Sequence, residues 1–250
     1  MDDFTHEELC QRFQTLMDII KCAVCMETVT GSNVVLCVNE HMICGCCAQK
    51  LAKCPTCAQP FSTLKPQRPL TQILEALPHS CRHNCGKVLT RDDDHETYCV
   101  LRQTQCKVCD EMVPGRVIYT HVTTKHPSTS VFTENRFPDR FTKFNQNQDI
   151  KCISIYNVSG HIFWQVIIND PVKQVLTKSY QYIPNGKPNC EIFIENEFNS
   201  AGTVFMSKFQ LNPNPEVDIQ KENIVIIPTF MLSKFMVKDD LKYKVNVTLI

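Results

Sequence analysis

The sequence has no excess of either charge and no long apolar run. Its 26 basic and 26 acidic residues give a formal net charge of zero at pH 7, so no global field draws the chain to nucleic acid or to an anionic membrane. No stretch approaches the roughly 18 apolar residues of a membrane-spanning helix, and the acidic, polar start MDDFTHEELCQRF is not typical of a signal peptide. We therefore expect neither nucleic acid nor membrane among the partners, and a cytoplasmic location with the nucleus left open as a second compartment.

Large apolar residues are scarce where cysteine is dense. Only three of the 14 phenylalanines precede residue 130 and the chain has seven glycines, whereas 14 of the 16 cysteines lie at or before Cys109. A segment with too few large side chains for a core needs covalent or metal staples, and in a reducing compartment grouped thiols more often hold metal than form disulfides. The sequence therefore predicts a metal-stapled first half, followed by a half that builds a hydrophobic core.

The first eight candidate ligands are spaced as zinc knuckles. Three groups follow one another along the chain: Cys22-x2-Cys25, Cys37-x3-His41-x2-Cys44-x2-Cys47 and Cys54-x2-Cys57. A gap of two residues turns both thiolates toward one tetrahedral zinc ion, so eight ligands make two sites. Cys46 has no partner at a suitable spacing and is interpreted as a bystander. A purely structural zinc module, without interleaved pairs, is the alternative interpretation.

Eight further candidates complete the set of ligands. They are Cys81-x3-Cys85-x9-His95-x3-Cys99 and Cys106-x2-Cys109-x11-His121-x4-His126. Sixteen ligands predict four tetrahedral zinc sites, with His79 and His83 as substitutes that flank Cys81. The last group has the spacing of a Cys-Cys-His-His finger, with both histidines expected on one helix. Its segment PGRVIYTHVTTKH is mostly apolar where residues that contact bases would lie, which argues against DNA binding.

Two amphipathic helices are predicted around the first zinc module. A capping-box pattern at Thr5 and Glu8 precedes four apolar residues at helical spacing, namely Leu9, Phe13, Leu16 and Ile20. Pro69 opens the second helix, PLTQILEALP, whose apolar face comprises Leu70, Ile73, Leu74 and Leu77. These faces either pack on their own zinc module or pair two copies of it.

The second half has the pattern of a β-sandwich of about 120 residues. Six runs rich in β-branched residues are expected to be strands: 151–156, 161–168, 191–195, 203–211, 223–227 and 242–250. A short helix, capped by Thr229, is expected between the last two. Trp164 and most of the phenylalanines would then lie in the core.

These parts resemble a known family. The eight-ligand order resembles a RING finger, and a RING followed by two zinc fingers and a β-sandwich resembles the seven-in-absentia ubiquitin ligases along nearly the whole chain. The match is carried by the HxxCxxC…CPTC segment, the leucine-rich helix after it, the His-x4-His ending, and the C-terminal LSKFMVKDDLKYKVNVTLI. The implied fold class is small zinc-stapled α+β modules followed by an all-β antiparallel, TRAF-like sandwich. The implied domains are an N-terminal helix (1–21), a RING (22–57), a linker with a short helix (58–80), tandem fingers (81–126) and the sandwich (131–250).

The resemblance also implies how the first two zinc ions are shared. In a RING the pairs interleave, so one ion takes Cys22, Cys25, Cys44 and Cys47, and the other takes Cys37, His41, Cys54 and Cys57. The cofactor is then zinc, with four ions in the chain.

The implied activity is that of a RING-type ubiquitin-protein ligase that has no covalent nucleophile. Its RING recruits a ubiquitin-charged conjugating enzyme through Val24, Leu51 and Pro55, and its sandwich recruits a substrate for ubiquitination and proteasomal degradation. Substrates would add as extended peptides along a sheet edge formed by Asp149, Ile150, Lys151 and Cys152. The implied partners are the conjugating enzyme, ubiquitin, protein substrates with an extended motif and a second copy of the chain.

Two positions depart from the family's pattern. RING ligases commonly carry a basic residue after the final zinc ligand, and here that residue is Ala58, followed by Gln59. Alanine has no side-chain donor, which favours weak activity or the alternative function, a non-catalytic TRAF-like adaptor or a decoy that dimerises with a true ligase and inhibits it. Ile150 stands where the family has a larger aromatic residue, which favours a different peptide.

Overall fold

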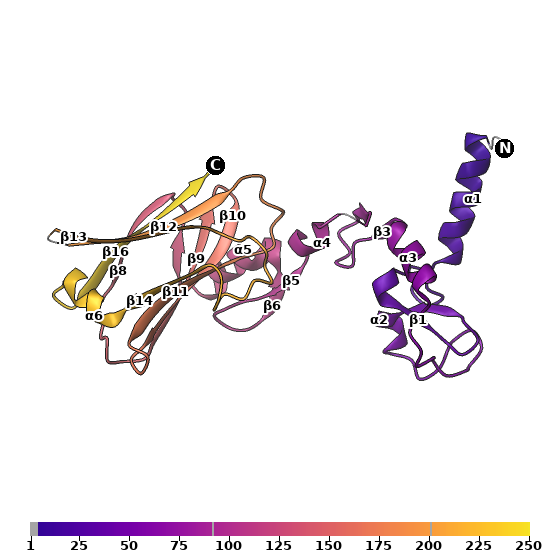
Figure 1. Cartoon of the computed structure of the whole chain (residues 1–250), viewed down its shortest axis with the longest axis horizontal. Coiled ribbons are helices and arrows are strands. Elements are labelled where there is room, and N and C mark those ends of the chain that lie inside the picture. The colour runs from indigo at the N-terminus through magenta and orange to yellow at the C-terminus, as the bar shows by residue number, and fades with distance from the viewer. Residues whose placement is uncertain (1–4, 92, 201) are drawn as a thin grey trace. The chain divides into compact units, whose positions relative to one another are not determined.

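Figure 1 shows the computed structural model of the chain, which describes residues 5–91, 93–200 and 202–250. The chain divides into two compact units, Met1–Asp94 and His95–Ile250. Among the described residues, no helix has both the length and the apolar character needed to cross a membrane.

The first unit begins with α1 (His6–Ile19), and the predicted capping box is confirmed. The backbone N–H of Glu8 donates to Thr5 Oγ1 at 3.3 Å, and the N–H of Thr5 donates to Glu8 Oε2 at 2.9 Å. No residue of α1 is buried, although Ile20, directly after it, is 4% exposed and joins the core of the zinc module. The helix is therefore anchored at its C-terminal end.

The rest of the first unit is a small α+β module with few regular elements. These are η1 (Gly31–Asn33), β1 (Val34–Leu36), β2 (Met42–Cys44), α2 (Gly45–Ala48), α3 (Arg68–Ala76), β3 (His79–Ser80) and β4 (Val88–Leu89). Pro69 lies in the first turn of α3 as predicted, and Leu74 is fully buried against the module. Ile73 of the same apolar face is 52% exposed, so the module covers this face only in part.

The second unit begins with the short elements of the zinc fingers. They are α4 (His95–Tyr98), β5 (Gln103–Gln105), β6 (Met112–Pro114) and α5 (Gly115–Lys125). β5 and β6 form an antiparallel hairpin that leads directly into α5.

A β-sandwich of two sheets makes up the rest of the second unit (Figure 1). One sheet has the order β14-β11-β10-β9-β7, from Ile224–Pro228, Val175–Tyr182, His161–Asp170, Ile150–Val158 and Ser130–Phe132. The other has the order β13-β12-β16-β15, from Thr203–Gln210, Ile192–Ser200, Asp240–Leu249 and Met236–Val237, and β8 (Arg136–Phe141) also pairs with β16. All pairs are antiparallel except β7 with β9. The all-β sandwich is thus confirmed, with β7, β8, β11 and β15 as strands that the sequence did not predict.

The core between the sheets is aromatic. Tyr156, Phe163, Tyr180 and Phe198 are all fully buried in it, and the rings of Tyr156 and Phe163 stack with their centroids 5.0 Å apart. Offset aromatic pairs at this separation add to the stabilisation from apolar burial.

The second finger and the sandwich share a second core. Ile118 and Val122 of α5 pack in one buried cluster with Ile162 and Trp164 of β10, and all four are at most 4% exposed. Successive residues of a strand point to opposite faces, so Phe163 faces the inter-sheet core while Trp164 faces the finger. Trp164 is buried as predicted, and its partners include the finger helix.

Close backbone contact accompanies this packing. A Cβ on Gly115, the first residue of α5, would overlap the carbonyl oxygen of Pro184, which follows β11. The finger helix and the sandwich are therefore closely packed where glycine begins the helix.

A short helical segment precedes the last strands, as expected. It comprises α6 (Thr229–Leu232) and η2 (Ser233–Phe235), and it buries Leu232 and Phe235. The expectation that Thr229 caps this helix is wrong. Pro228 is the N-cap, and the hydroxyl of Thr229, already inside the helix, donates to the carbonyl of Gln174 at 3.2 Å.

Candidate metal centres and binding surfaces

Four clusters of cysteine and histidine side chains could each hold a metal ion. Within each cluster, one ligand atom from every residue lies within 4.8 Å of the others. The clusters are Cys22/Cys25/Cys44/Cys47, Cys37/His41/Cys54/Cys57, Cys81/Cys85/His95/Cys99 and Cys106/Cys109/His121/His126. These are the sixteen residues that spacing had singled out, grouped in the same sets of four.

The first two clusters interleave along the chain. Counted in chain order, ligands one, two, five and six meet at one point, and ligands three, four, seven and eight meet at another. A metal at each point therefore ties four separate segments of a small module together. In a segment with so little apolar core, such cross-links supply much of the folding free energy.

The distances within the clusters fit tetrahedral zinc. With Zn–S bonds of about 2.3 Å and Zn–N bonds of about 2.0–2.1 Å, a tetrahedron has S···S edges of about 3.8 Å and S···N edges of about 3.5 Å. The Sγ atoms of Cys25 and Cys44 are 3.8 Å apart, and Sγ of Cys37 is 3.5 Å from His41 Nδ1. In the fourth cluster, Cys109 Sγ is 3.4 Å from His121 Nε2. The four clusters are thus suitable for zinc.

Three of the cysteine knuckles share one backbone conformation. In the first, the N–H of Cys22 donates to the carbonyl of Glu27 at 2.8 Å and the N–H of Met26 donates to the carbonyl of Cys22 at 2.9 Å. The knuckles that begin at Cys54 and Cys106 repeat both hydrogen bonds. In all three, the residue after the second cysteine has a positive φ, between 54° and 61°. This turn brings the two thiols of each pair to the same side.

Hydrogen bonds from backbone amides and burial have opposite effects on the pKa values of the ligand thiols. Burial raises the pKa of Cys22, but hydrogen bonds from backbone N–H groups, led by that of Cys25, lower it to about 6 overall. Cys54 behaves in the same way, with a pKa of about 6. Burial and the neighbouring thiols raise the pKa of Cys44 to about 12. The amides therefore favour the thiolate form that binds metal, while the crowded thiols need a cation before all of them can ionise.

A carboxylate supports the fourth cluster from behind. His121 is 7% exposed and directs Nε2 at Cys109, while its Nδ1 lies 4.0 Å from Glu111 Oε2. A hydrogen bond from Lys125, followed by the charges of Lys125 and His121, lowers the pKa of Glu111 and keeps it ionised. At 4.0 Å the Glu111 carboxylate is too far from Nδ1 for a direct hydrogen bond, so it acts on His121 through its charge.

One detail of the fourth cluster differs from the expectation. His121 lies in α5, but His126 is the C-cap residue with φ −129° and ψ 60°, so the two histidines do not share one helix. The spacing of five residues exceeds one helical turn, and the chain leaves the helix before the second histidine.

The cysteine and histidines interpreted as bystanders or substitutes lie outside the four clusters that the described residues form. Cys46 is exposed and its Sγ lies 3.7 Å from Asn33 Nδ2. His79 lies in β3, and His83 follows Cys81, whose sulfur accepts the N–H of His83 at 3.4 Å.

The three residues expected to contact a conjugating enzyme lie in or beside the RING knuckles. Val24, between the first two ligands, is 46% exposed, Leu51 follows α2 and is partly exposed, and Pro55 is exposed between Cys54 and Cys57. Ala58 is exposed at φ 54°, and its N–H already donates to the carbonyl of Cys54 at 2.8 Å. Neither the backbone nor the side chain of Ala58 offers a further donor.

The expected peptide-binding edge is open over only part of its length. Ile150, Lys151 and Cys152 lie in β9 and pair with Asn169, Ile168 and Ile167 of β10, and Asp149 precedes the strand. On the other side, β7 pairs with β9 from Ser154 onward. Among the described strands, none pairs with residues 150–153 on that side.

The hairpin geometry shows which amides face this open side. Ser159 and Gly160 form the two-residue turn between β9 and β10, both with positive φ (51° and 85°), as in a type I′ turn. Such a turn closes on a hydrogen-bonded pair, and hydrogen-bonded pairs then alternate along the strands. Counting from Val158 opposite His161, Cys152 directs its amide at β10, whereas Lys151 directs its amide outward.

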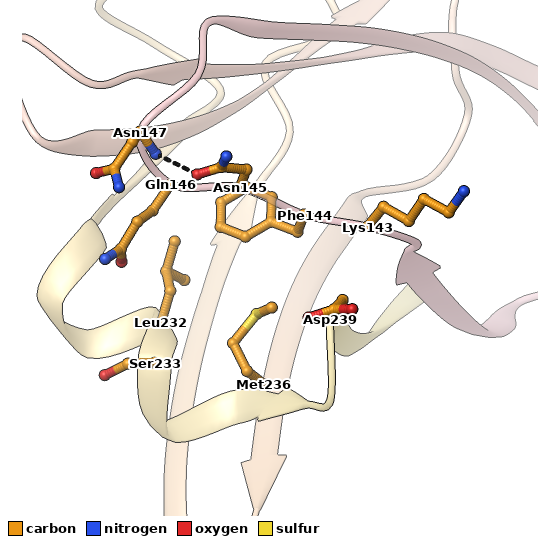
Figure 2. A pocket seen from close by; sticks show the side chains of 9 residues that line it. All are labelled: Lys143, Phe144, Asn145, Gln146, Asn147, Leu232, Ser233, Met236 and Asp239. Carbon is orange, nitrogen blue, oxygen red and sulfur yellow. Dashed lines mark hydrogen bonds between the residues drawn. The ribbon is translucent and has the colours of Figure 1, made fainter.

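A pocket of about 650 Å³ lies elsewhere on the sandwich (Figure 2). It is bounded by the loop 143–147 on one side and by the α6–η2 segment with Met236 and Asp239 on the other. Phe144, Leu232 and Met236 give it an apolar floor, while Asn145 accepts the backbone N–H of Asn147 at 3.0 Å at its rim. The sequence had not pointed to this pocket, because its residues come together only across the β8–β9 loop and the last helical segment.

Known proteins resemble this chain along most of its length. No family model matches the sequence. SINA-like 9 from Arabidopsis thaliana is 25% identical over 244 residues, which cover 86% of this chain and 82% of that protein. The E3 ubiquitin-protein ligase siah2 from Xenopus laevis is 25% identical over 187 residues, covering 70% of this chain and 55% of the relative.

The E3 ubiquitin-protein ligase sina from Drosophila melanogaster is 22% identical over 161 residues, which cover 61% of this chain and 51% of the relative. The chain therefore spans about half the length of the fly and frog proteins and most of the plant protein. Together with the four metal clusters, these relatives support the resemblance of the chain to the SINA/SIAH family.

Proposed function

We propose that this protein is a RING-type ubiquitin-protein ligase. The interleaving of the first two clusters is the main support for the proposal. Metal ions at these two clusters would hold the exposed segments that contain Val24, Leu51 and Pro55 in fixed positions within one small module. Two of the relatives bear the name E3 ubiquitin-protein ligase, which supports the same activity. The domain boundaries stay those expected from the sequence, with a RING at 22–57, tandem fingers at 81–126 and a substrate-binding sandwich at 131–250.

The proposed mechanism needs no nucleophile from this chain. Zinc supplies rigid cross-links, and the chain's own residues Val24, Leu51 and Pro55 then form an apolar docking surface for a ubiquitin-charged conjugating enzyme. Apolar groups held in place by a rigid frame lose little entropy on binding, which suits a small hot spot. The rate gain comes from proximity and orientation, since conjugating enzyme and substrate are held on one chain.

Substrates are proposed to bind by strand addition to β9. The open side of residues 150–153 offers the outward amide of Lys151, and exposed Lys151 also protects this edge from aggregation in the free protein. Main-chain hydrogen bonds would supply affinity, and alternate side chains would supply specificity. The edge is short, because β7 covers it from Ser154 onward.

One observation favours a second candidate function. Ala58 stands after the last RING ligand, and its only donor is used inside the knuckle. Without a donor at this point, the module would bind conjugating enzyme without ordering ubiquitin. The chain would then act as a non-catalytic adaptor, or as a decoy that dimerises with a true ligase.

The exposed apolar face of α1 supports a dimer in either case, since Leu9, Phe13 and Ile19 are 51%, 47% and 69% exposed. Sixteen cysteines without a disulfide fit the proposed cytoplasmic location, with the nucleus as a second compartment.

An autoubiquitination assay with a panel of conjugating enzymes separates the two functions. A ligase should form polyubiquitin with at least one enzyme of the panel, and the double substitution Cys37→Ser/His41→Ala should abolish this activity by removing the second RING site. No transfer with any enzyme, by a protein that still binds one of them and carries its zinc, would establish the adaptor instead.

A further inference from the structure

A thiol, an imidazole and a phenol meet at one end of the sandwich, outside the four metal clusters. His161 begins β10, Tyr182 ends β11, and Cys190 lies in the loop before β12. Nε2 of His161 lies 3.5 Å from Sγ of Cys190, and Nδ1 lies 3.5 Å from the hydroxyl oxygen of Tyr182. Both nitrogens of one imidazole are thus in contact with polar side chains.

The hydrogen bond of Tyr182 determines which nitrogen of His161 carries the hydrogen. The Tyr182 hydroxyl donates its single proton to the carbonyl of Gly186 at 3.1 Å. Toward His161 the phenol oxygen can therefore only accept, so Nδ1 carries the hydrogen and Nε2 keeps its lone pair. That lone pair faces Cys190, whose S–H donates to it.

The surroundings keep the imidazole and the phenol neutral. Burial lowers the pKa of His161, so at pH 7 the ring is in the form that can accept a proton. Burial, and then the charges of Cys190 and Tyr98, raise the pKa of Tyr182 and keep its proton in place. Among the described residues, the titratable groups in hydrogen-bond contact with His161 are Cys190 and Tyr182.

The loop that carries Cys190 is fixed to its neighbours. Asn185 Nδ2 donates to the carbonyl of Gly160 at 3.2 Å, and the N–H of Gly186 donates to the carbonyl of Tyr98 at 2.9 Å. After the cysteine, Glu191 exchanges backbone hydrogen bonds of 2.9 and 3.0 Å with Ile250. Cys190 itself is partly exposed, so a small reagent can reach the sulfur of a thiol that is held in place.

We propose that Cys190 is a nucleophilic thiol, with His161 as its general base and Tyr182 as the residue that positions the base. A nucleophile, a base in hydrogen-bond reach and a third group that orients the base form the arrangement that activates thiols. The ligand class is a soft carbon electrophile, which makes Cys190 a site of covalent modification. The S–C bond forms as the bond to the leaving group breaks, the leaving group departs with the bonding electrons, and the thiol proton passes to Nε2 of His161. The proposal is independent of the ligase function, which uses no cysteine nucleophile.

The chain contains two comparison thiols. Cys10 lies 3.7 and 3.9 Å from the two nitrogens of His6 on the exposed surface of α1. Cys46 is exposed beside an asparagine. Both should react as ordinary thiols.

The expected gain in rate is modest. A thiol with an ordinary pKa of about 8.5 is about 3% ionised at pH 7, so complete ionisation would raise the rate about 30-fold. The lower intrinsic nucleophilicity of a more acidic thiol reduces this gain to about threefold to fourfold.

The test measures alkylation of the zinc-loaded full chain by limiting iodoacetamide at pH 7. Peptide mapping by mass spectrometry gives the rate at each thiol, and Cys190→Ser identifies the labelled peptide. Cys190 should react about threefold to fourfold faster than Cys46. His161→Asn should bring Cys190 down to the rate of Cys46 and leave Cys10 and Cys46 unchanged.

Tyr182→Phe keeps the ring and removes only the acceptor oxygen, so it tests positioning without a cavity. It should shift the pH profile of Cys190 alkylation toward that of Cys46, which a purely structural role of Tyr182 would not do. Equal rates at Cys190 and Cys46, or a Cys190 rate that neither substitution changes, would overturn the proposal. A fifth zinc ion that protects Cys190 and is lost in His161→Asn would also overturn it, by showing a ligand pair in place of a nucleophile.

Discussion

Loss of metal from the fourth cluster should destabilise the sandwich, whereas loss from the first cluster should not. The fourth cluster holds α5, whose Ile118 and Val122 are fully buried in one core with Trp164 of the sandwich. Among the described residues, the core around the first cluster is formed by residues between Met17 and Leu77. The two metal sites therefore support different cores.

The size of the effect follows from the two buried side chains. Full burial of a valine or isoleucine contributes about 1.5–3 kcal/mol, so detachment of α5 removes about 3–6 kcal/mol from the sandwich. In a unit of this size, each kcal/mol lowers the unfolding midpoint by about 2–4 °C, which predicts a fall of roughly 6–24 °C.

Two matched double substitutions test this difference. In both clusters the second residue is exposed and the fourth is partly exposed, so Cys109→Ser/His126→Ala and Cys25→Ser/Cys47→Ser remove equivalent ligands. Trp164, the single tryptophan, is 1% exposed and lies in the shared core, so its fluorescence reports unfolding there.

Metal analysis should give four zinc ions for the unaltered chain and fewer for each variant. The Trp164 midpoint should fall only in the variant of the fourth cluster. Equal midpoints in both variants, with zinc loss verified in each, would refute the structural coupling between finger and sandwich.

The other predictions concern ubiquitin transfer and substrate capture. Val24→Ala should lower transfer at least tenfold at unchanged zinc content, whereas Val88→Ala, at an exposed valine outside the RING, should not; equal losses would remove Val24 from the docking surface. Ala58→Arg should raise transfer by supplying a hydrogen-bond donor. The conformational cost is small, because alanine and arginine are strained alike at the positive φ of this position. If the unaltered protein is active and the variant is no faster, the missing donor does not limit transfer. Lys151→Pro should abolish peptide capture while Lys151→Ala preserves it, and capture by a folded Lys151→Pro protein would place docking elsewhere.

The metal clusters could be predicted from the sequence because a zinc knuckle is a local structure. Six residues of chain, from Cys22 to Glu27, with one positive φ and two backbone hydrogen bonds, suffice to bring Cys22 and Cys25 together. The capping box at Thr5 was equally local. Strand β11 was missed, since its central residue Lys178 is polar in sequence but fully buried, with its ammonium 3.5 Å from the ring centroid of Tyr243. Because Tyr243 belongs to the opposite sheet, the residues next to Lys178 in the sequence do not indicate this contact.

The cluster of Cys190, His161 and Tyr182 could not be predicted from the sequence, although the number of cysteines outside the metal clusters could. Subtracting twelve cysteine ligands from sixteen cysteines leaves four thiols, of which Cys46 and Cys190 are two, and nothing in the spacing distinguishes them. The β10–β11 pairing brings His161 beside Tyr182 across 21 positions, and the following loop returns Cys190 to the same imidazole. A single hydrogen bond from Tyr182 to Gly186 then determines that the nitrogen facing the sulfur keeps its lone pair. Whether a leftover thiol is inert or reactive thus depends on contacts that form only after both sheets have folded.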